Sequence, residues 1–333
     1  MKLMDCTLRD GANVVGKGFS KELTVMMIEG LIKSGVTTIE MGNALGIGAY
    51  EGQNSVAPLT DNEYLDVAQP YLPRAEIGMF IGVRNAVPKY IDLAASRGLH
   101  FLRVGANAGD GDSAIEGIKY VKKKGLFCRY SLMKGYILSA KELAAEAAKL
   151  EAAGLDEITI MDSAGTMTPE QVGEYVSEMA GKIKIPVAFH GHNNLGLSAA
   201  NAIAAERAGA GVLDCGLMGM ARSAGNLATE LALAIMNRRG VRTGADFYTL
   251  LHFIDEELAP AMARHNYHAA ITPVDLVYGL AGCHSSFAKL FEDAAKRHGV
   301  DLYRLIMEVS AIDQKAPSAE LIDKIACDIK GGN

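Results

Sequence analysis

Short apolar runs alternate with longer segments of helical period along the first three quarters of the chain. Short apolar runs bounded by turn residues are typical of buried strands, whereas the longer segments favour amphipathic helices. The sequence predicts eight strands, at residues 3–8, 36–41, 77–81, 100–104, 126–132, 156–161, 185–189 and 212–215.

Each predicted strand is followed by a segment with helix start and stop signals. Ser139 and Glu142 have the spacing of a capping box, and Gly154 follows the end of the same segment. Thr168 precedes Pro169, which suits the first position of a helix. Helices are expected at residues 21–34, 61–71, 88–97, 113–124, 139–153, 197–208 and 226–238, and from residue 168 onwards.

Eight strands that alternate with eight helices imply parallel strands joined by helical crossovers. This number of units predicts a (β/α)₈ TIM barrel, an α/β fold, rather than an open doubly wound sheet. No G-x-G-x-x-G pattern follows the first strand, which argues against a dinucleotide-binding fold. We therefore expect residues 1–244 to form a catalytic barrel.

The alternation stops near residue 245. Helices follow one another at 246–264, 273–280, 285–298, 302–310 and 318–329, with no strand between them. We expect residues 245–333 to form a C-terminal helical domain that packs on the barrel.

Composition narrows the function classes. The formal net charge is −6, so no broad basic surface argues for nucleic acid, and no apolar run approaches the roughly 20 residues of a membrane span. The five cysteines are scattered without a C-x-x-C pair, and the first residues lack a secretory signal pattern. These features predict a cytoplasmic protein with free thiols.

Polar residues gather where the predicted strands end, which is the active face of a TIM barrel. His190 and His192 are two residues apart at the end of one strand, so they point to the same side. Taken alone, the pair is as readily two ordinary polar residues as two metal ligands. Because a barrel closes, Asp10 after the first strand can meet them, and Asn226 can add a carbonyl oxygen. This donor set suits Mn²⁺, Mg²⁺, Fe²⁺, Co²⁺ or Zn²⁺.

Two further residues have both a structural and a functional interpretation. Arg9 adjoins Asp10 and either forms a salt bridge inside the barrel or stabilises an enolate and binds a carboxylate. Ser163 follows the sixth strand and either satisfies its own loop or hydrogen-bonds a substrate carboxylate.

Three motifs resemble those of the DRE-TIM metallolyase superfamily: residues 7–11 (TLRDG), 190–194 (HGHNN) and 225–230 (GNLATE). The resemblance is closest to the 4-hydroxy-2-oxovalerate aldolases, because the loop before Asn226 is compact and residues 285–287 (SSF) match their C-terminal helical domain. Such enzymes cleave a 4-hydroxy-2-oxo acid to pyruvate and an aldehyde.

The resemblance also implies roles for individual residues. The metal, most often Mn²⁺, with Mg²⁺, Co²⁺ and Zn²⁺ as alternatives, is held by Asp10, His190, His192 and Asn226. Arg9 stabilises a metal-bound enolate. The residues implied to contact the substrate are Arg9, Ser163 and His190.

Two positions depart from the aldolase pattern. Asn13 stands where the aldolases have a histidine base, and an amide cannot take a proton at neutral pH. His284 stands where they have a tyrosine. We hypothesise that His284 replaces the missing base; the alternative is that it only packs at the domain junction.

The sequence is also compatible with two other functions. A Claisen-type acyl-CoA lyase or synthase of the same superfamily would need an acyl-CoA site, and a non-catalytic metal-binding homologue would explain the lost histidine. The resemblance further implies a small 2-oxo acid substrate, an acylating aldehyde dehydrogenase as partner, and a homodimer. The loop at residues 42–57 is expected to line the aldehyde side of the pocket.

Overall fold

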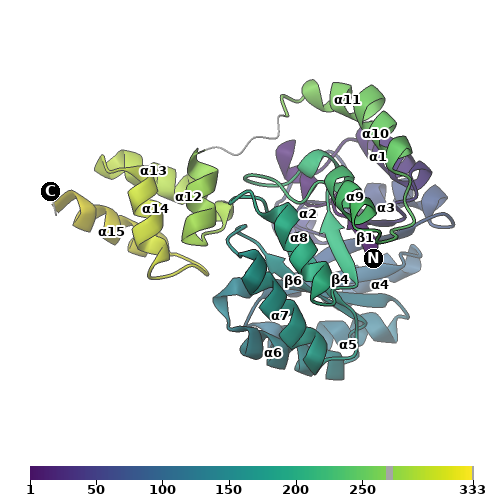
Figure 1. The fold of residues 1–333 in the computed structure, drawn as a ribbon, viewed down its shortest axis with the longest axis horizontal. Helices are drawn as coiled ribbons and strands as arrows, with labels where there is room; N and C mark the ends of the chain where they lie inside the picture. The colour runs from purple at the N-terminus through teal and green to yellow at the C-terminus, as the bar shows by residue number, and fades with distance from the viewer. Residues whose placement is uncertain (268–272, 332–333) are drawn as a thin grey trace.

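The computed structural model describes residues 1–267 and 273–331, and eight parallel strands close into a barrel within them (Figure 1). Each strand pairs with the next in sequence, and β8 pairs with β1 to close the ring. The strands are β1 (Lys2–Asp5), β2 (Thr38–Met41), β3 (Glu76–Gly82), β4 (Phe101–Asn107), β5 (Phe127–Met133), β6 (Glu157–Asp162), β7 (Val187–Gly191) and β8 (Val212–Cys215). The predicted TIM barrel is confirmed.

Helices cover the outside of the barrel and bury their apolar faces against the strands. They are α1 (Lys21–Lys33), α2 (Ala49–Gly52), α3 (Asp61–Ala68), α4 (Pro88–Ser96), α5 (Ile115–Lys123), α6 (Ala140–Ala152), α7 (Pro169–Lys182), α8 (Ser198–Arg207) and α9 (Thr229–Arg238). Short 3₁₀ turns lie at Gly11–Val14, Gln69–Tyr71, Val83–Asn85, Gly111–Ala114, Gly135–Ile137, Leu217–Gly219 and Ser285–Phe287. The expected capping box of Ser139 and Glu142 is present at the start of α6.

Three predicted boundaries were wrong, and the first two concern the elements that carry the site. β1 ends at Asp5 rather than at residue 8, because the main-chain N–H groups of Arg9 and Asp10 turn back onto the carbonyl of Cys6. β7 runs two residues further than predicted, so His190 lies within the strand. The helix predicted at 113–124 begins later, after the 3₁₀ turn Gly111–Ala114.

Two glycines make room for aromatic rings inside the barrel. A Cβ added at Gly78 would lie 2.4 Å from the Phe101 ring, and one at Gly105 would lie 2.4 Å from the Phe80 ring. Both distances are far shorter than a van der Waals contact, so only glycine fits at these two strand positions. Phe80 consequently reaches the cavity at the carboxyl ends of the strands.

The helix predicted at 246–264 is divided in the structure. α10 (Phe247–Phe253) and α11 (Ala259–Ala263) are joined by a π-helical turn at Ile254–Leu258. Pro260, at the start of α11, has no N–H to continue the α-helical bonding pattern, which accounts for the interruption. Both helices pack on the barrel, and the Phe253 ring lies against Gly30 of α1.

Four further helices lie beside the barrel and share a separate core (Figure 1). They are α12 (Pro273–Ala281), α13 (Ala288–His298), α14 (Leu302–Ser310) and α15 (Ala319–Gly331). Phe291, Leu305 and Ile306 are fully buried in that core. The division of the chain at residue 245 stays a prediction, and the predicted C-terminal domain includes 268–272 and 332–333, which lie outside the described residues. From the packing of α10 and α11, we propose that the C-terminal unit begins with α12.

Polar contacts hold this C-terminal unit against the mouth of the barrel. The Lys134 ammonium, from the turn after β5, donates to the carbonyl of Lys315 and lies 5.4 Å from the centre of the Phe287 ring. The Lys315 ammonium in turn pairs with Asp110 at 3.0 Å. Across the described residues, no helix combines the length and the apolar character needed to cross a membrane.

Replacing Phe253 with alanine tests whether α10 belongs to the barrel. We expect the free energy of unfolding to fall by about 3–5 kcal/mol, because the substitution leaves a cavity against α1. Urea unfolding measures this, and Ile312→Ala, at a side chain that is 62% exposed, is the control with an expected change within about 0.5 kcal/mol. Equal, small effects of the two substitutions would show that α10 contributes little to the barrel.

Candidate active site

A cavity of about 320 Å³ opens at the carboxyl ends of the strands. Its volume lies at the lower end of the range of about 300–1,000 Å³ found for small-molecule sites. Residues from both the barrel and the C-terminal unit line it. Among them are Arg9, Asp10, Phe80, Lys134, Ser163, His190, His192, Arg222, His284 and Ser286.

Three residues predicted as metal ligands converge at this cavity. One donor atom each of Asp10, His190 and His192 lies within 4.8 Å of the other two, and all three side chains are buried. Oδ2 of Asp10 is 3.5 Å from Nε2 of His190 and 3.8 Å from Nε2 of His192. The turn after β1 and the end of β7 bring them together.

Asn226, the fourth predicted ligand, lies beside the other three. Its side-chain amide donates to Oδ2 of Asp10 at 2.9 Å, while its own Oδ1 is buried with no hydrogen-bond partner among the described residues. A main-chain bridge between His192 and Asn226 fixes the two residues relative to each other. This bridge therefore fixes the loop after β8 against the end of β7.

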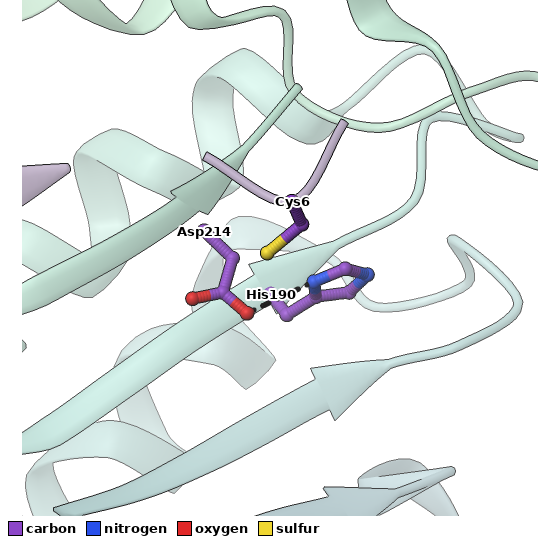
Figure 2. A group of neighbouring side chains, drawn as sticks. All are labelled: Cys6, His190 and Asp214. Atoms are coloured by element: carbon purple, nitrogen blue, oxygen red, sulfur yellow. Dashed lines mark hydrogen bonds and ion pairs between the residues drawn. The ribbon is translucent and has the colours of Figure 1, made fainter. Parts of the chain in front are cut away.

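A second group of potential ligands surrounds the other ring nitrogen of His190 (Figure 2). Nδ1 of His190 lies 3.1 Å from Oδ2 of Asp214, and Cys6 completes the group. However, the buried Arg103 guanidinium donates to Asp214 and, at 3.3 Å, to the Cys6 sulfur. This fixed positive charge opposes a metal ion between them. The group instead orients His190, because a hydrogen bond from Nδ1–H leaves Nε2 free to face Asp10.

Arg9 belongs to a buried chain of ion pairs. Its Nε donates to Glu40 at 2.5 Å, and its Nη1 lies 3.2 Å from Asp10. Glu40 also accepts two bonds from Arg103, at 2.5 and 2.8 Å, and Arg103 continues to Asp214. Nη2 of Arg9 has no partner among the described residues although it is buried. A rigid cation with one free donor thus adjoins the predicted ligand cluster.

These contacts set the protonation of the cluster. Burial alone would raise the pKa of Asp10, but Arg9 and the two histidines hold it well below its usual range. Burial likewise opposes ionisation of Asp214, yet Arg103 and His190 lower its pKa to about 2. Burial lowers the pKa of His192 to about 4, so this imidazole is neutral at pH 7. For His190, burial lowers the pKa, but the nearby carboxylates of Asp10 and Asp214 outweigh burial and raise it overall.

Ser163 lies at the cavity wall after β6. Its Oγ accepts a hydrogen bond from the main-chain N–H of Lys134 at 2.9 Å, which leaves the hydroxyl proton free to donate. Lys134 has a left-handed backbone conformation (φ 57°), and it is the one lysine among the residues that line this cavity. Burial lowers the pKa of the Lys134 ammonium.

His284 reaches the cavity from the C-terminal unit. Its ring centre lies 6.3 Å from that of His192, in an edge-to-face arrangement. Nδ1 of His284 accepts a hydrogen bond from the main-chain N–H of Ser286 at 3.1 Å, so the neutral ring carries its proton on Nε2. Burial, together with Arg222 and His192, lowers its pKa to about 3.

Asn13 lies beside the cluster, contacts Asp10, and is not among the residues that line the cavity. Its side-chain amide donates to the main-chain oxygen of Asp10 at 2.9 Å, and it lies 3.5 Å from Oδ1 of the same residue. It therefore braces the turn that carries Asp10.

Sequence reasoning did not identify two cations of the cavity, Lys134 and Arg222. Lys134 follows β5, whose end showed no unusual pattern of polar residues. Arg222 lies in the loop between β8 and Asn226, where a charged residue in a stretch of small residues was the available signal. Neither position has a local periodicity that would indicate which way the side chain points.

Two protein-family models match the chain. One, described as HMGL-like, matches residues 110–255, and the other, described as a DmpG-like communication domain, matches residues 269–329. The second match covers most of helices α12 to α15.

Curated relatives match over almost the whole chain. The 4-hydroxy-2-oxovalerate aldolase 2 of Rhodococcus jostii (strain RHA1) is 32% identical over 329 residues, which cover 99% of this chain and 95% of that protein. The 4-hydroxy-2-oxovalerate aldolase of Desulfitobacterium hafniense (strain DSM 10664 / DCB-2) is 32% identical over 309 residues, 93% of this chain and 92% of that protein. Among solved structures, the carboxyl transferase domain of Rhizobium etli pyruvate carboxylase gives a TM-score of 0.80 at 14% identity. It covers 100% of this chain and 60% of that chain, and the likeness shows the fold alone.

Replacing Glu40 with glutamine tests the buried ion pairs. We expect the free energy of unfolding to fall by about 3–5 kcal/mol, because Arg9 and Arg103 lose the carboxylate between them. Urea unfolding measures this. Glu51→Gln is the matched control, since its pair with Lys89 is exposed and worth about 0–1 kcal/mol. A loss at Glu40 no larger than that at Glu51 would contradict a stabilising role.

Proposed function

Because this chain belongs to the family of the 4-hydroxy-2-oxovalerate aldolases, we propose that it is a divalent-metal-dependent carbon–carbon lyase. Its substrate is a 4-hydroxy-2-oxo acid such as 4-hydroxy-2-oxovalerate, which it cleaves to pyruvate and an aldehyde. The observation that carries the proposal is the convergence of Asp10, His190 and His192, with Arg9 beside them, at the wall of one cavity.

The residues present fit a divalent ion. They offer one carboxylate and two imidazoles. Among the described residues, the buried Oδ1 of Asn226 accepts no hydrogen bond, and the buried Nε2 of His190 forms none and lies 3.5 Å from Oδ2 of Asp10. Two such buried, unsatisfied acceptors are expected where a cation completes the site. Mn²⁺ suits this mixture of oxygen and nitrogen donors. When bound, a divalent ion polarises the keto group of the substrate.

Arg9 and Ser163 position the 2-oxo acid in this proposal. The free Nη2 of Arg9 donates to the oxygen that gains negative charge as the carbon–carbon bond breaks. Because Glu40 and Asp10 already hold the guanidinium, little reorganisation is needed at that moment. The Ser163 hydroxyl donates to the substrate carboxylate, while its oxygen stays bonded to Lys134.

His284 is our candidate for the group that exchanges the proton of the 4-hydroxyl. It lines the cavity and is neutral at pH 7, as an acceptor must be. To accept at Nε2, the ring must move its proton to Nδ1 and give up the bond from Ser286, which costs about 1 kcal/mol. The Asn13 amide cannot take up a proton at neutral pH, and it hydrogen-bonds to the main chain of Asp10 instead.

The C-terminal unit supports a proposal about partners. A DmpG-like communication domain favours contact with an aldehyde dehydrogenase that receives the released aldehyde. Tyr303, Met307 and Ile312 expose apolar side chains on and after α14, which suits a protein contact. Homodimerisation is proposed on the same basis.

Metal removal is the first test. We expect EDTA to abolish pyruvate release and Mn²⁺ to restore it, with Co²⁺, Zn²⁺ and Mg²⁺ compared in parallel. Asp10→Asn should weaken Mn²⁺ binding, measured by electron paramagnetic resonance, because the one carboxylate of the cluster is lost. Binding should also weaken as the pH falls, since His190 and His192 must be neutral to bind a metal.

Borohydride trapping in the presence of pyruvate is the matched control. We expect no covalent label, because the proposed reaction uses no Schiff base. Labelling of Lys134, together with full activity in EDTA, would overturn the metal-dependent proposal.

The second test replaces His284 with glutamine. We expect kcat to fall by about 10²–10⁴-fold near pH 7, because glutamine cannot exchange a proton, and to recover partly at high pH as hydroxide takes over. His252→Gln, at an exposed side chain of α10, is the matched control and should keep full activity. If His284→Gln keeps most of its activity, His284 does not transfer the proton.

A further inference from the structure

Arg222 is a cation of the active-site cavity that the proposed reaction does not use. It lies in the loop between β8 and α9, is half-buried, and lines the same cavity as Asp10, His192 and His284. Its main-chain oxygen accepts a bond from Gly225 at 3.0 Å, which closes a tight turn directly before Asn226.

The loop that carries Arg222 is anchored at several points. The Leu217 N–H donates to Thr7 at 2.7 Å, and the Met218 N–H donates to Glu230 at 3.1 Å. The Tyr267 hydroxyl donates to the carbonyl of Met218 at 3.1 Å. These bonds hold the backbone of the loop in place, and the Arg222 side chain extends from it to the cavity.

The Arg222 guanidinium makes no hydrogen bond or ion pair within the described part of the chain. A half-buried cation without a partner is unfavourable, because partial desolvation is not compensated. Burial and Arg9 lower the pKa of Arg222, while Asp10 opposes this effect. Burial, and to a smaller extent Arg222, lower the pKa of the Lys17 ammonium as well, so a second cation lies near Arg222.

The charges around the cavity are unbalanced. Arg9, Lys134 and Arg222 line it, but Asp10 is the one carboxylate among the lining residues. Asp10 is already held by Arg9 and Asn226 and faces the two histidines. The proposed reaction assigns the carboxylate of the 2-oxo acid to Ser163 and its developing oxyanion to Arg9, so Arg222 remains without an anion.

We propose that Arg222 binds a second acidic group at the aldehyde end of the substrate, so that the substrates are 2-oxo acids with a further carboxylate or phosphate. The proposal rests on the proposed aldolase function. Arg222 and His284 line the same cavity, and because His284 is assigned to the 4-hydroxyl, the proposal puts the guanidinium on the aldehyde side of the bond that breaks. A guanidinium matches the planar geometry of a carboxylate with two parallel hydrogen bonds. Cleavage of such a substrate releases pyruvate and an acidic aldehyde.

Matched pairs of uncleavable 2-oxo acids test the site without catalysis. The pairs are 2-oxoglutarate with 2-oxovalerate and 2-oxoadipate with 2-oxohexanoate; within each, the acids differ only at the distal end. Calorimetry on the full chain with Mn²⁺ should show at least one dicarboxylate binding about 10- to 100-fold more tightly than its partner, as for a hydrogen bond to a charged group. Equal affinities within both pairs would overturn the proposal.

Arg222→Gln should abolish the preference within each pair and leave the monocarboxylates within about threefold of wild type. Arg222→Lys keeps the charge and should keep part of the preference. Arg84→Gln, at an exposed arginine of the adjoining cavity, is the control and should leave both affinities unchanged. If Arg222→Gln weakens both members of a pair by the same factor, the guanidinium holds the common 2-oxo acid end and the proposal is wrong.

Condensation of pyruvate with aldehydes separates this proposal from the aldolase function itself. Wild type should favour glyoxylate, succinic semialdehyde or glycolaldehyde phosphate over acetaldehyde and propionaldehyde, and the favoured acid identifies carboxylate or phosphate. Condensation with neutral aldehydes alone would refute the acidic site and keep the aldolase. Failure to condense any aldehyde, with the dicarboxylate preference intact, would refute the aldolase and keep the anion site.

Discussion

The structure depends on the requirement that charges inside a closed barrel be paired. Arg9, Glu40, Arg103 and Asp214 form one continuous chain of ion pairs across the interior, and they come from the turn after β1, from β2, from β4 and from β8. The chain ends on His190, whose ring it orients. An isolated charge at any of these positions would be costly, so each residue fixes the next. The position of the predicted ligand cluster is therefore set by the whole barrel.

Much of this arrangement could be predicted from the sequence, because it follows from topology. Eight alternating units imply a closed barrel, and closure brings the turn after β1 beside β7 and β8. The meeting of Asp10, His190, His192 and Asn226 needs no knowledge of side-chain rotamers. The early end of β1 did not disturb it, since the turn at Cys6 keeps Asp10 at the same face of the barrel.

The rest of the site could not be predicted, because it depends on the directions of side chains in loops and on pairing between distant segments. The anchored loop after β8 directs Arg222 into the cavity. A left-handed turn after β5 does the same for Lys134. The tautomer of His284 follows from one bond to Ser286. The packing of α10 on α1 could not be predicted either, because a glycine within a helix, such as Gly30, does not indicate which aromatic ring packs against it.

The anchored loop after β8 carries Arg222 and Asn226 only four positions apart, and this has a consequence for how the protein diverges. A change in loop length would displace Asn226, the fourth predicted ligand, together with Arg222, the residue proposed to bind the far end of the substrate. Insertions or deletions in this loop would therefore disturb the predicted metal site whenever they change substrate selectivity. Single substitutions at position 222 remain open, because the turn is held by main-chain bonds that any residue supplies. Among homologues with this loop length, we therefore expect substrate selectivity to follow the side chain at position 222.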